Sequence, residues 1–278
     1  MANHTSKNTI PILSIILTIL GIAIISYPTI SNIFNSRQMV TEINVYSDTI
    51  STMSKSQIEK EWQKAVDYNN SLMGNPVKDP FVPGSGVALP QNYMEVLDID
   101  GIMGYIEIPK INIEIPIFHG TSEEVLKKGV GHLEGSALPI GGDGTHALLS
   151  GHTGLPEAKL FTDLTKLQNG DKFIIKVLDR KIAYKVCRID VVKPEDISRL
   201  SAVKGKDYVT LITCTPYGIN SHRLLVRGER VYEISDMIEI VKKNSYIIVT
   251  VLIISTNGML LWIVGYYRNR NKRIRETE

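Results

Sequence analysis

The sequence predicts a mainly β protein: a closed or nearly closed β-barrel with short helices, preceded by a helical segment and flanked by two transmembrane helices. Two observations lead to this fold class. Between Gly104 and Val226, about seven short apolar or alternating segments are separated by Gly, Pro and Asp turns, as in all-β barrels. Outside that region, two stretches of more than twenty residues, Ile10–Phe34 and Ser245–Tyr267, carry no charge and satisfy the length criterion for membrane spans.

The composition excludes several classes of protein. Of 278 residues, 43% are apolar and 22% are charged, which fits neither a disordered chain nor a collagen-like fibre. The 31 basic and 29 acidic residues give a net charge of +2, so binding to nucleic acid through bulk charge is excluded. Two cysteines, Cys187 and Cys214, are too few for a disulfide scaffold or a cysteine-ligated zinc site.

The two uncharged stretches are interpreted as membrane helices. As helices, Ile10–Ile30 and Ser245–Tyr267 would measure about 31 and 34 Å at ~1.5 Å per residue, enough for a bilayer core. The alternatives are buried core helices or, for the first, a signal peptide, although the apolar run exceeds the usual signal length. Aromatic residues near the ends of the second stretch suit the lipid headgroup region; they are Tyr246, Trp262, Tyr266 and Tyr267.

Basic residues predict the orientation of the chain. Five follow the second span, against only Lys242 and Lys243 before it, so the C-terminus is expected in the cytoplasm. Two spans then place the N-terminus in the cytoplasm too, and residues 35–244 outside the cell. The part outside the spans and the cytoplasmic ends carries 25 basic and 27 acidic residues. The five are Arg268, Arg270, Lys272, Arg273 and Arg275.

Residues 35–73 are predicted to be helical. Ser56–Glu59 has the spacing of a capping box, Trp62 lies on the apolar face as a docking anchor, and Gly74 follows as a stop. Residues 75–90, with four prolines and two glycines, form a loop.

Seven strands are predicted from Gly104 onward, with Pro109 and Pro116 at edge or terminal positions. The strands are Tyr105–Ile108, Ile111–Ile117, Ala147–Leu149, Phe173–Leu178, Ile182–Val192, Tyr208–Ile212 and Leu224–Val226. Short helices are expected at Ser122–Lys128, Ala158–Leu167 and Pro194–Leu200.

Metal and phosphate sites find little support. His132, Asp143, His146 and His152 lie within 21 residues, but no pair has a local chelating spacing. Gly141–Gly144 lacks the Lys-Ser/Thr and helix that a phosphate loop requires, so it is interpreted as a turn. His119, His132 and His146 are expected to form hydrogen bonds in loops or at strand ends.

Cysteine chemistry is favoured instead. Cys214 ends an apolar strand, Arg223 begins the next one, and His152 follows the strand that ends at Ser150. A thiolate is a nucleophile, an imidazole can take its proton, and a guanidinium can stabilise an oxyanion. Spacing alone leaves open the alternative that Cys214 is a small buried apolar residue. Cys187 lies in an alternating strand and is expected to be packed, and a disulfide with Cys214 is rejected because it would disable the nucleophile.

Three motifs resemble those of sortases, the cysteine transpeptidases of Gram-positive cell surfaces. Thr210–Cys214 (TLITC) matches their TLxTC signature, Ser150–Gly154 resembles their histidine motif, and Asn220–Leu224 their arginine motif. The resemblance covers about residues 45–265. It implies an eight-stranded sortase-type barrel in which Cys214 attacks the Thr–Gly carbonyl of an LPXTG-like sorting signal. It also implies that His152 transfers protons and that Arg223 supports the oxyanion or orients the substrate.

The second span and the Pro-rich loop resemble class C, the pilin-polymerising sortases. In that class the loop is a lid, which implies that Asp79 approaches Arg223 and Phe81 covers Cys214. The alternative is a solvated Asp and a Phe that merely anchors a loop. Thr213 and Tyr217, beside Cys214, are predicted to contact the substrate or the lid. No calcium-type acidic cluster is present, and no cofactor or metal is proposed.

The sequence therefore predicts a two-pass membrane enzyme with an extracellular catalytic domain and both termini in the cytoplasm. Its partners would be pilin subunits bearing LPXTG-like signals, an acceptor pilin's lysine amine and the membrane, with no nucleic acid. The alternatives are a sortase that anchors proteins to a cell-wall peptide and a non-catalytic surface domain. The expected segments are an N-terminus (1–9), a span (10–34), a helical segment (35–74), a lid loop (75–90), a barrel (91–234), a juxtamembrane segment (235–244), a span (245–267) and a basic tail (268–278).

Overall fold

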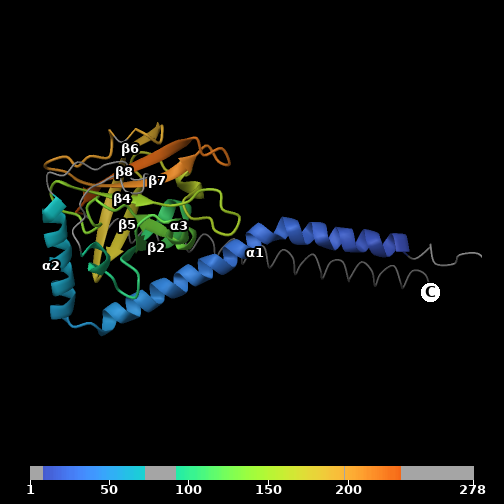
Figure 1. Cartoon of the computed structure of the whole chain (residues 1–278), viewed down its shortest axis with the longest axis horizontal. Coiled ribbons are helices and arrows are strands. Elements are labelled where there is room, and N and C mark those ends of the chain that lie inside the picture. Colours follow the sequence, from blue (N-terminus) through green and yellow to red (C-terminus); the bar gives the residue numbers. More distant parts are fainter. Residues whose placement is uncertain (1–8, 73–91, 197, 233–278) are drawn as a thin grey trace, which may run out of the picture. The chain divides into compact units, whose positions relative to one another are not determined.

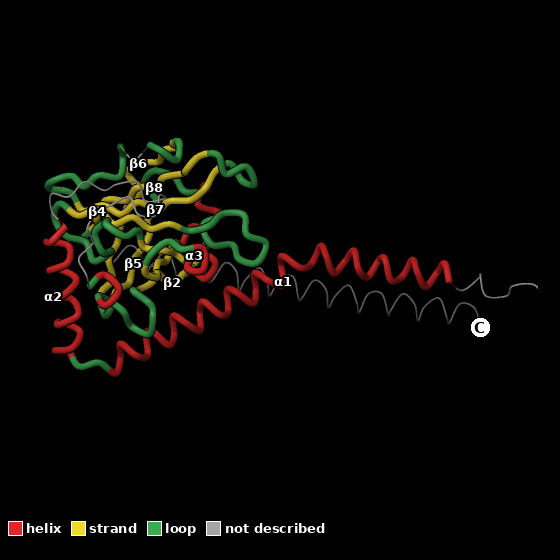
Figure 2. The backbone as a smooth tube through the Cα atoms, viewed as in Figure 1, coloured by secondary structure: helices red, strands yellow, loops and turns green. Residues whose placement is uncertain are grey.

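Eight strands close into a barrel in the order β1-β2-β3-β4-β7-β8-β6-β5, and β5 pairs with β1. The computed structural model describes residues 9–72, 92–196 and 198–232, and Figures 1 and 2 show the strands gathered in one body. The strands are β1 (Gly104–Ile108), β2 (Ile113–His119), β3 (Val130–His132), β4 (Thr145–Ser150), β5 (Lys172–Val177), β6 (Arg180–Val192), β7 (Asp207–Thr215) and β8 (His222–Val231).

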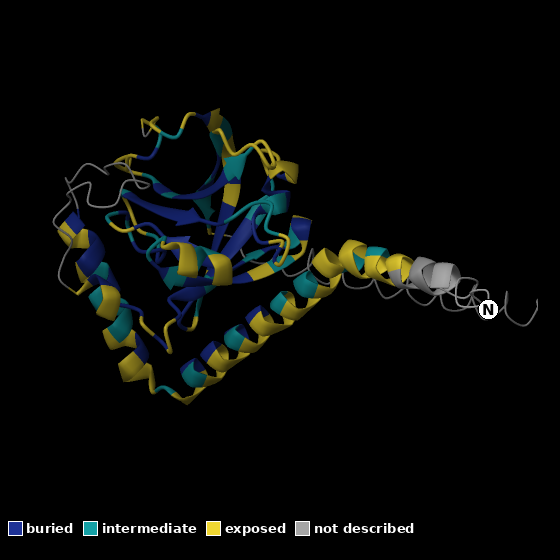
Figure 3. Cartoon of the chain, turned by 45° about the vertical axis from the view of Figure 1, so that its right-hand side comes forward, coloured by how far each residue is buried: buried dark blue, intermediate teal, exposed yellow. Residues whose placement is uncertain are grey.

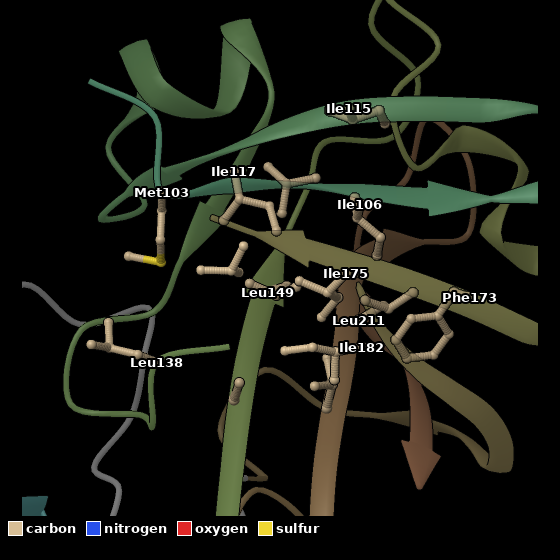
Figure 4. Packing of buried hydrophobic residues seen from close by; sticks show 14 of the residues in the cluster. Met103, Ile106, Ile115, Ile117, Leu138, Leu149, Phe173, Ile175, Ile182 and Leu211 are labelled. Carbon is tan, nitrogen blue, oxygen red and sulfur yellow. The ribbon is translucent and has the colours of Figure 1, made fainter. Parts of the chain in front are cut away.

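The barrel interior is filled by every second residue of each strand, because side chains alternate between the two faces of a strand. Ile106 of β1 lies opposite Ile115 of β2 and Ile175 of β5, and Leu149 of β4 lies opposite Leu211 of β7. All five are buried and converge in the packed centre shown in Figure 4. Each such aliphatic side chain contributes about 1.5–3 kcal/mol to folding by leaving water.

Strand β3 is the one that the sequence pattern missed. It has only three residues, one of them Gly131, so it offers no alternation to detect. It pairs in parallel with β2 from Ile117 onward and antiparallel with β4. Pro116 precedes that pairing, at a point where β2 has β1 on one side only. Pro109 lies in a 3₁₀ turn between β1 and β2, so both prolines occupy positions that need no ladder hydrogen bond.

The helical segment before the barrel is divided differently from the prediction. Helix α1 runs without a break from Thr9 to Thr52, and α2 covers Lys55–Leu72. The capping box at the start of α2 is formed by Ser54 and Gln57 rather than by Ser56 and Glu59. The Ser54 N–H donates to Gln57 Oε1 (2.8 Å), and the Gln57 N–H donates to Ser54 Oγ (3.3 Å). Trp62 is a docking anchor as expected, packed against the core, with the Arg180 guanidinium 3.9 Å from its ring centroid.

Of the three short helices predicted within the barrel, one is present. Helix α3 (Glu123–Lys128) begins where the Ser122 hydroxyl accepts from the Val125 N–H. The helix expected at 158–167 is reduced to a 3₁₀ turn at Thr162–Lys166, because Leu160 has a positive φ of 34°, which an α-helix does not accept.

The prediction of a helix at 194–200 is wrong as well. Pro194–Asp196 and Ser198–Leu200 form turns. The Asp196 carboxylate accepts from both the N–H and the hydroxyl of Ser198 (3.1 and 2.5 Å), and such a local side-chain bond competes with helix formation.

Helix α1 changes character along its length, as Figure 3 shows. Its C-terminal half buries one stripe against the barrel, formed by Met39, Ile43, Tyr46 and Ile50. The Tyr46 hydroxyl accepts from the Leu178 N–H (2.7 Å) and donates to the Met103 carbonyl (3.4 Å). Its N-terminal half exposes large aliphatic residues, among them Ile25, which is 79% exposed.

Among the described residues, one helix is long and apolar enough to cross a membrane, the Leu17–Thr52 part of α1. The exposed aliphatic half agrees with the predicted first span, and the half beyond residue 38 packs on the barrel. The second predicted span and the basic tail lie outside the described residues.

A second hydrophobic cluster lies on the outer face of β4, β7 and β8. Its members on β4, β7 and β8 alternate with the core residues of the same strands, so they point away from the barrel interior. We call this the outer cluster; it consists of Leu133, Leu148, Val192, Leu200, Ile212 and Leu225. Leu200 comes from the loop between β6 and β7, which therefore covers this face.

Candidate active site

Cys214 and Arg223 are direct neighbours across the β7–β8 pair. Their Cα atoms are register partners in the antiparallel ladder, so both side chains leave the sheet on the same face, with Cβ atoms about 4.5–5.5 Å apart. Because β7 alternates, this is the outer face, which Ile212 also occupies. Both side chains are partly exposed, and Arg223 Nη1 donates to the carbonyls of Asn220 and His222 (3.2 Å each). A free thiol and a guanidinium thus meet at the end of the outer face.

His152 is brought to the same end by the parallel pairing of β4 with β7. Ser150 is the register partner of Ile212, and the Gly151 N–H donates to the Ile212 carbonyl (3.0 Å). The Thr213 hydroxyl donates in turn to the Gly151 carbonyl (2.7 Å). Thr213 is 2% exposed, so its side chain joins the two strands rather than facing a ligand. His152 therefore lies two residues beyond the end of β4, directly after Gly151, which is hydrogen-bonded to the two residues that precede Cys214.

The loop that carries His152 is packed closely on both sides. A Cβ atom at Gly151 would lie 2.6 Å from the Phe161 ring, so only glycine fits there, and the Phe161 N–H donates to the His152 carbonyl (3.1 Å). Gly154 has a φ of 76°, and a Cβ atom there would lie 3.2 Å from the Tyr217 ring. Tyr217, which is 69% exposed, thus connects the turn after Cys214 with the His152 loop.

The electrostatic environment favours the neutral form of the His152 imidazole. Partial burial lowers the pKa of His152 below its usual value; Glu123 of α3 opposes this decrease and Lys127 adds to it. A neutral imidazole can accept a proton from a thiol, and the imidazolium that results can donate one to a leaving amine. The arrangement therefore brings a thiol, an imidazole and a guanidinium to one end of the outer face.

His146 holds the loop that covers the outer cluster. Its Nδ1 faces the Ser201 carbonyl (3.1 Å) and therefore donates, so its Nε2 accepts from the Thr210 hydroxyl (2.7 Å). Arg227 also donates to the Arg199 carbonyl in the same loop. Thr210 lies on the Cys214 face of β7, so these contacts hold the β6–β7 loop on the face that carries Cys214. The sequence predicted that His146 forms hydrogen bonds, but not that they hold the β6–β7 loop, although the alternation of His146, Leu148 and Ser150 along β4 indicates one shared face.

His119 and His132 form structural hydrogen bonds, as the sequence predicted. His132 is fully buried, its Nε2 bonds the Ala137 carbonyl (2.8 Å) and its Nδ1 lies 2.9 Å from the Tyr93 hydroxyl. His119 bonds the Val96 carbonyl (2.8 Å). Within the described part of the chain, no group of three or more His, Cys, Asp or Glu side chains could hold a metal ion.

The Gly141–Gly144 segment is a turn, in agreement with the sequence. Gly141, Gly142 and Gly144 all have positive φ, which glycine adopts at no steric cost. The Gly142 N–H donates to the Asp207 carboxylate (2.9 Å), so the turn is bound to the start of β7.

The prediction that Cys187 is packed is wrong, because its side chain is exposed. The ladder between β6 and β8 shifts register between Val186 and Arg188. Cys187 is the extra residue of this bulge and turns away from the packed face. Both cysteines are free thiols. Asp79 and Phe81, the predicted lid residues, lie outside the described residues.

Comparison with known proteins agrees with this geometry. A sortase domain model matches residues 106–231. Sortase A of Bacillus anthracis is 32% identical over 179 residues, 63% of this chain and 83% of that protein.

Solved structures give a similar result. Sortase C1 of Streptococcus agalactiae is 43% identical, with a TM-score of 0.65 over 71% of this chain and 98% of that one. Sortase C of Streptococcus pneumoniae is 44% identical, with a TM-score of 0.64 over 69% of this chain and 97% of the other.

The matched region includes all the strands that carry His152, Cys214 and Arg223, and the eight-stranded closed barrel is shared with the class C structures. The chain therefore belongs to the sortase family of cysteine transpeptidases and, by its structural neighbours, to class C.

Proposed function

We propose that this protein joins pilin subunits, with Cys214 as nucleophile, His152 as proton-transfer group and Arg223 as the cation that stabilises the oxyanion or orients the substrate. The observation that carries the proposal is the cross-strand register of Cys214 with Arg223, at the strand end where the β4–β7 pairing delivers His152. The sulfur would attack the carbonyl carbon between Thr and Gly of an LPXTG-like sorting signal.

In the first half-reaction the thiol proton passes to His152 and a C–S bond forms. The carbonyl oxygen becomes an oxyanion beside Arg223, whose guanidinium stays charged at any relevant pH. When the C–N bond to Gly breaks, the His152 imidazolium gives its proton to the leaving amine. The product is a thioester on Cys214 and a released C-terminal fragment.

In the second half-reaction a lysine amine of another pilin attacks the thioester. His152 takes a proton from the attacking nitrogen, the C–S bond breaks, and the thiolate of Cys214 returns with an isopeptide bond formed. Class C neighbours support a pilin acceptor: one is a sortase C1 of a pilus island, and another was described in terms of pilin substrate specificity.

The proposed topology is that of a two-pass membrane protein. The first span is residues 10–34 and the second residues 245–267, with the barrel (91–234) outside the cell and both termini in the cytoplasm. The uncharged stretches and the basic residues 268–275 support this proposal, and the exposed aliphatic half of α1 supports the first span. The topology is tested in intact cells with a Cys187→Ala, Cys214→Ala chain that carries a single cysteine at residue 4 or at residue 276. A membrane-impermeant thiol reagent should label neither of these cysteines.

The catalytic proposal is tested by incubating the full chain in lipid vesicles with a pilin that bears an LPXTG-like signal. We expect covalent ladders on a denaturing gel and, with the Cys214→Ala variant, none. Replacing the pilin by a peptidoglycan-derived amine tests the cell-wall alternative. Efficient transfer to that amine with no pilin ladder would contradict the proposed role in pilus assembly. Ladders formed by the Cys214→Ala variant would contradict the assignment of Cys214 as the nucleophile.

A further inference from the structure

The barrel-facing stripe of α1 does not end with its apolar residues. One turn before Met39, the stripe continues as Asn35 and Asn32, both partly buried. The spacing of 32, 35, 39 and 43 keeps these residues on one face of the helix. Exposed residues occupy the positions between them, including Ile33, Phe34 and Ser36. Two amides therefore replace apolar anchors where α1 leaves the predicted membrane span.

Both amides hydrogen-bond the backbone of the loop that carries His152. Asn35 Nδ2 donates to the Glu157 carbonyl (2.6 Å), and Asn32 Oδ1 accepts from the Lys159 N–H (2.9 Å). The Tyr27 hydroxyl adds a longer contact to Glu157 Oε1 (3.4 Å). Backbone partners fix the direction of each bond: a carbonyl needs a donor and an N–H needs an acceptor.

The contacted residues are close to the fixed parts of that loop. Ala158 and Leu160 are 3% and 2% exposed, and Phe161, two residues after Lys159, donates its N–H to the His152 carbonyl. Lys159 also forms an ion pair with Asp163 (2.5 Å). The loop thus has one attachment at β7, through Gly151, and a second at α1.

We propose that Asn32 and Asn35 of α1 are positioning residues, which fix the 151–161 loop and thereby place His152 for proton transfer. The inference rests on the proposed role of His152. It makes the helix that is expected to anchor the enzyme in the membrane part of the support of its active site.

The test uses the full chain in lipid vesicles, with the Asn32→Ala, Asn35→Ala double variant and Ser36→Ala as the matched control on the exposed face. Hydrogen exchange followed by mass spectrometry should show the 152–161 segment exchanging at least about tenfold faster in the double variant, since two bonds that hold the segment are lost and one of them protects the Lys159 N–H directly. Peptide cleavage should show kcat reduced about three- to tenfold with KM within twofold. Ser36→Ala should match the wild-type chain in both measurements.

Single variants test the direction of the bonds. Asn32→Asp keeps an acceptor for the Lys159 N–H and should retain nearly full kcat. Asn35→Asp loses the donor and sets a carboxylate against the Glu157 carbonyl, so it should behave like the double variant. Equal hydrogen-exchange rates of the 152–161 segment in the double variant and the wild-type chain would show that Asn32 and Asn35 do not hold the loop, whatever the activity. Faster exchange with unchanged kcat would overturn the positioning role, and a His152→Ala variant with full activity would overturn the proposed function instead.

Discussion

The β7–β8 strand pair has two ends that use similar residues in opposite ways. At one end, Asp207 is 8% exposed and accepts from the Gly142 N–H (2.9 Å) and the Tyr184 hydroxyl (3.0 Å), with Arg230 at 3.5 Å. At the other end, Cys214 and Arg223 are partly exposed. One end is closed by a buried carboxylate with protein partners. At the other end, a thiol and a guanidinium reach solvent, as the proposed substrate site requires.

The electrostatics of the two ends follow from this difference. Burial raises the pKa of Asp207, and the Gly142 N–H, Arg230 and the Tyr184 hydroxyl oppose that effect, so these partners favour the charged carboxylate. Partial burial instead lowers the pKa of His152. Residues at the closed end should therefore affect stability, and residues at the open end should affect activity.

The largest effect is expected for Cys214→Ala, which should abolish acyl-enzyme formation. The thioester has no other nucleophile from which to form, while the loss of one partly exposed sulfur should change the free energy of unfolding by less than about 1 kcal/mol. Mass spectrometry of the enzyme mixed with a sorting peptide measures the acyl adduct. Cys187→Ala, at the exposed bulge, is the control and should retain the adduct.

The proton-transfer and oxyanion groups should come next. His152→Ala and Arg223→Ala should each reduce kcat/KM by about 10²–10⁴. Arg223→Lys should recover little of this, because an ammonium does not reproduce the planar guanidinium. Steady-state cleavage of a fluorogenic sorting peptide gives these values. A fully active Arg223→Lys enzyme would show that charge alone is needed at this position.

A fall in pH should destabilise the buried parts of the barrel before it affects the open end. Burial lowers the pKa values of His132 and His146 to about 4, below the usual value of about 6.5. Below pH 6.5 the unfolded chain binds protons that the folded chain does not, so stability falls as the pH drops from about 6.5 to about 4, by about 3 kcal/mol per histidine at most. Urea unfolding at pH 7.5, 6 and 5 measures this. His132→Asn should flatten the dependence, and an unchanged slope would contradict the assignment.

Substitutions at the closed end should have the smallest of these effects, and they should alter only the free energy of unfolding. Asp207→Ala removes the acceptor for Tyr184, Gly142 and Arg230 and should lower the free energy of unfolding by about 2–3 kcal/mol, with kcat within twofold at a temperature where the variant is folded. Glu59→Ala breaks the exposed pair with Arg180 (2.7 Å) and, as a surface control, should cost less than about 1 kcal/mol. Reduced kcat in folded Asp207→Ala would show that the two ends are coupled.

Local pattern was sufficient for much of the fold. The uncharged run at the N-terminus, seven of the eight strands and α3 were predicted because each depends on residues close in sequence: periodicity, turn residues and a cap. The errors have local causes as well. Strand β3 is too short to alternate, Leu160 adopts a positive φ, and the side chain of Asp196 bonds Ser198.

The sequence by itself determined which residues we propose as catalytic, because the motifs around His152, Cys214 and Arg223 are short and each is continuous in the chain. Only the tertiary structure decided how they meet, because β4 and β7 are about sixty residues apart in the chain and pair in parallel, a contact that no local pattern encodes. The same holds for the bulge that exposes Cys187, for the hold of His146 on the β6–β7 loop, and for the bonds from Asn32 and Asn35 to residues more than 120 positions away. Hydrogen bonds and ladder registers between distant segments form only when the whole barrel closes, so they are properties of the fold rather than of any segment.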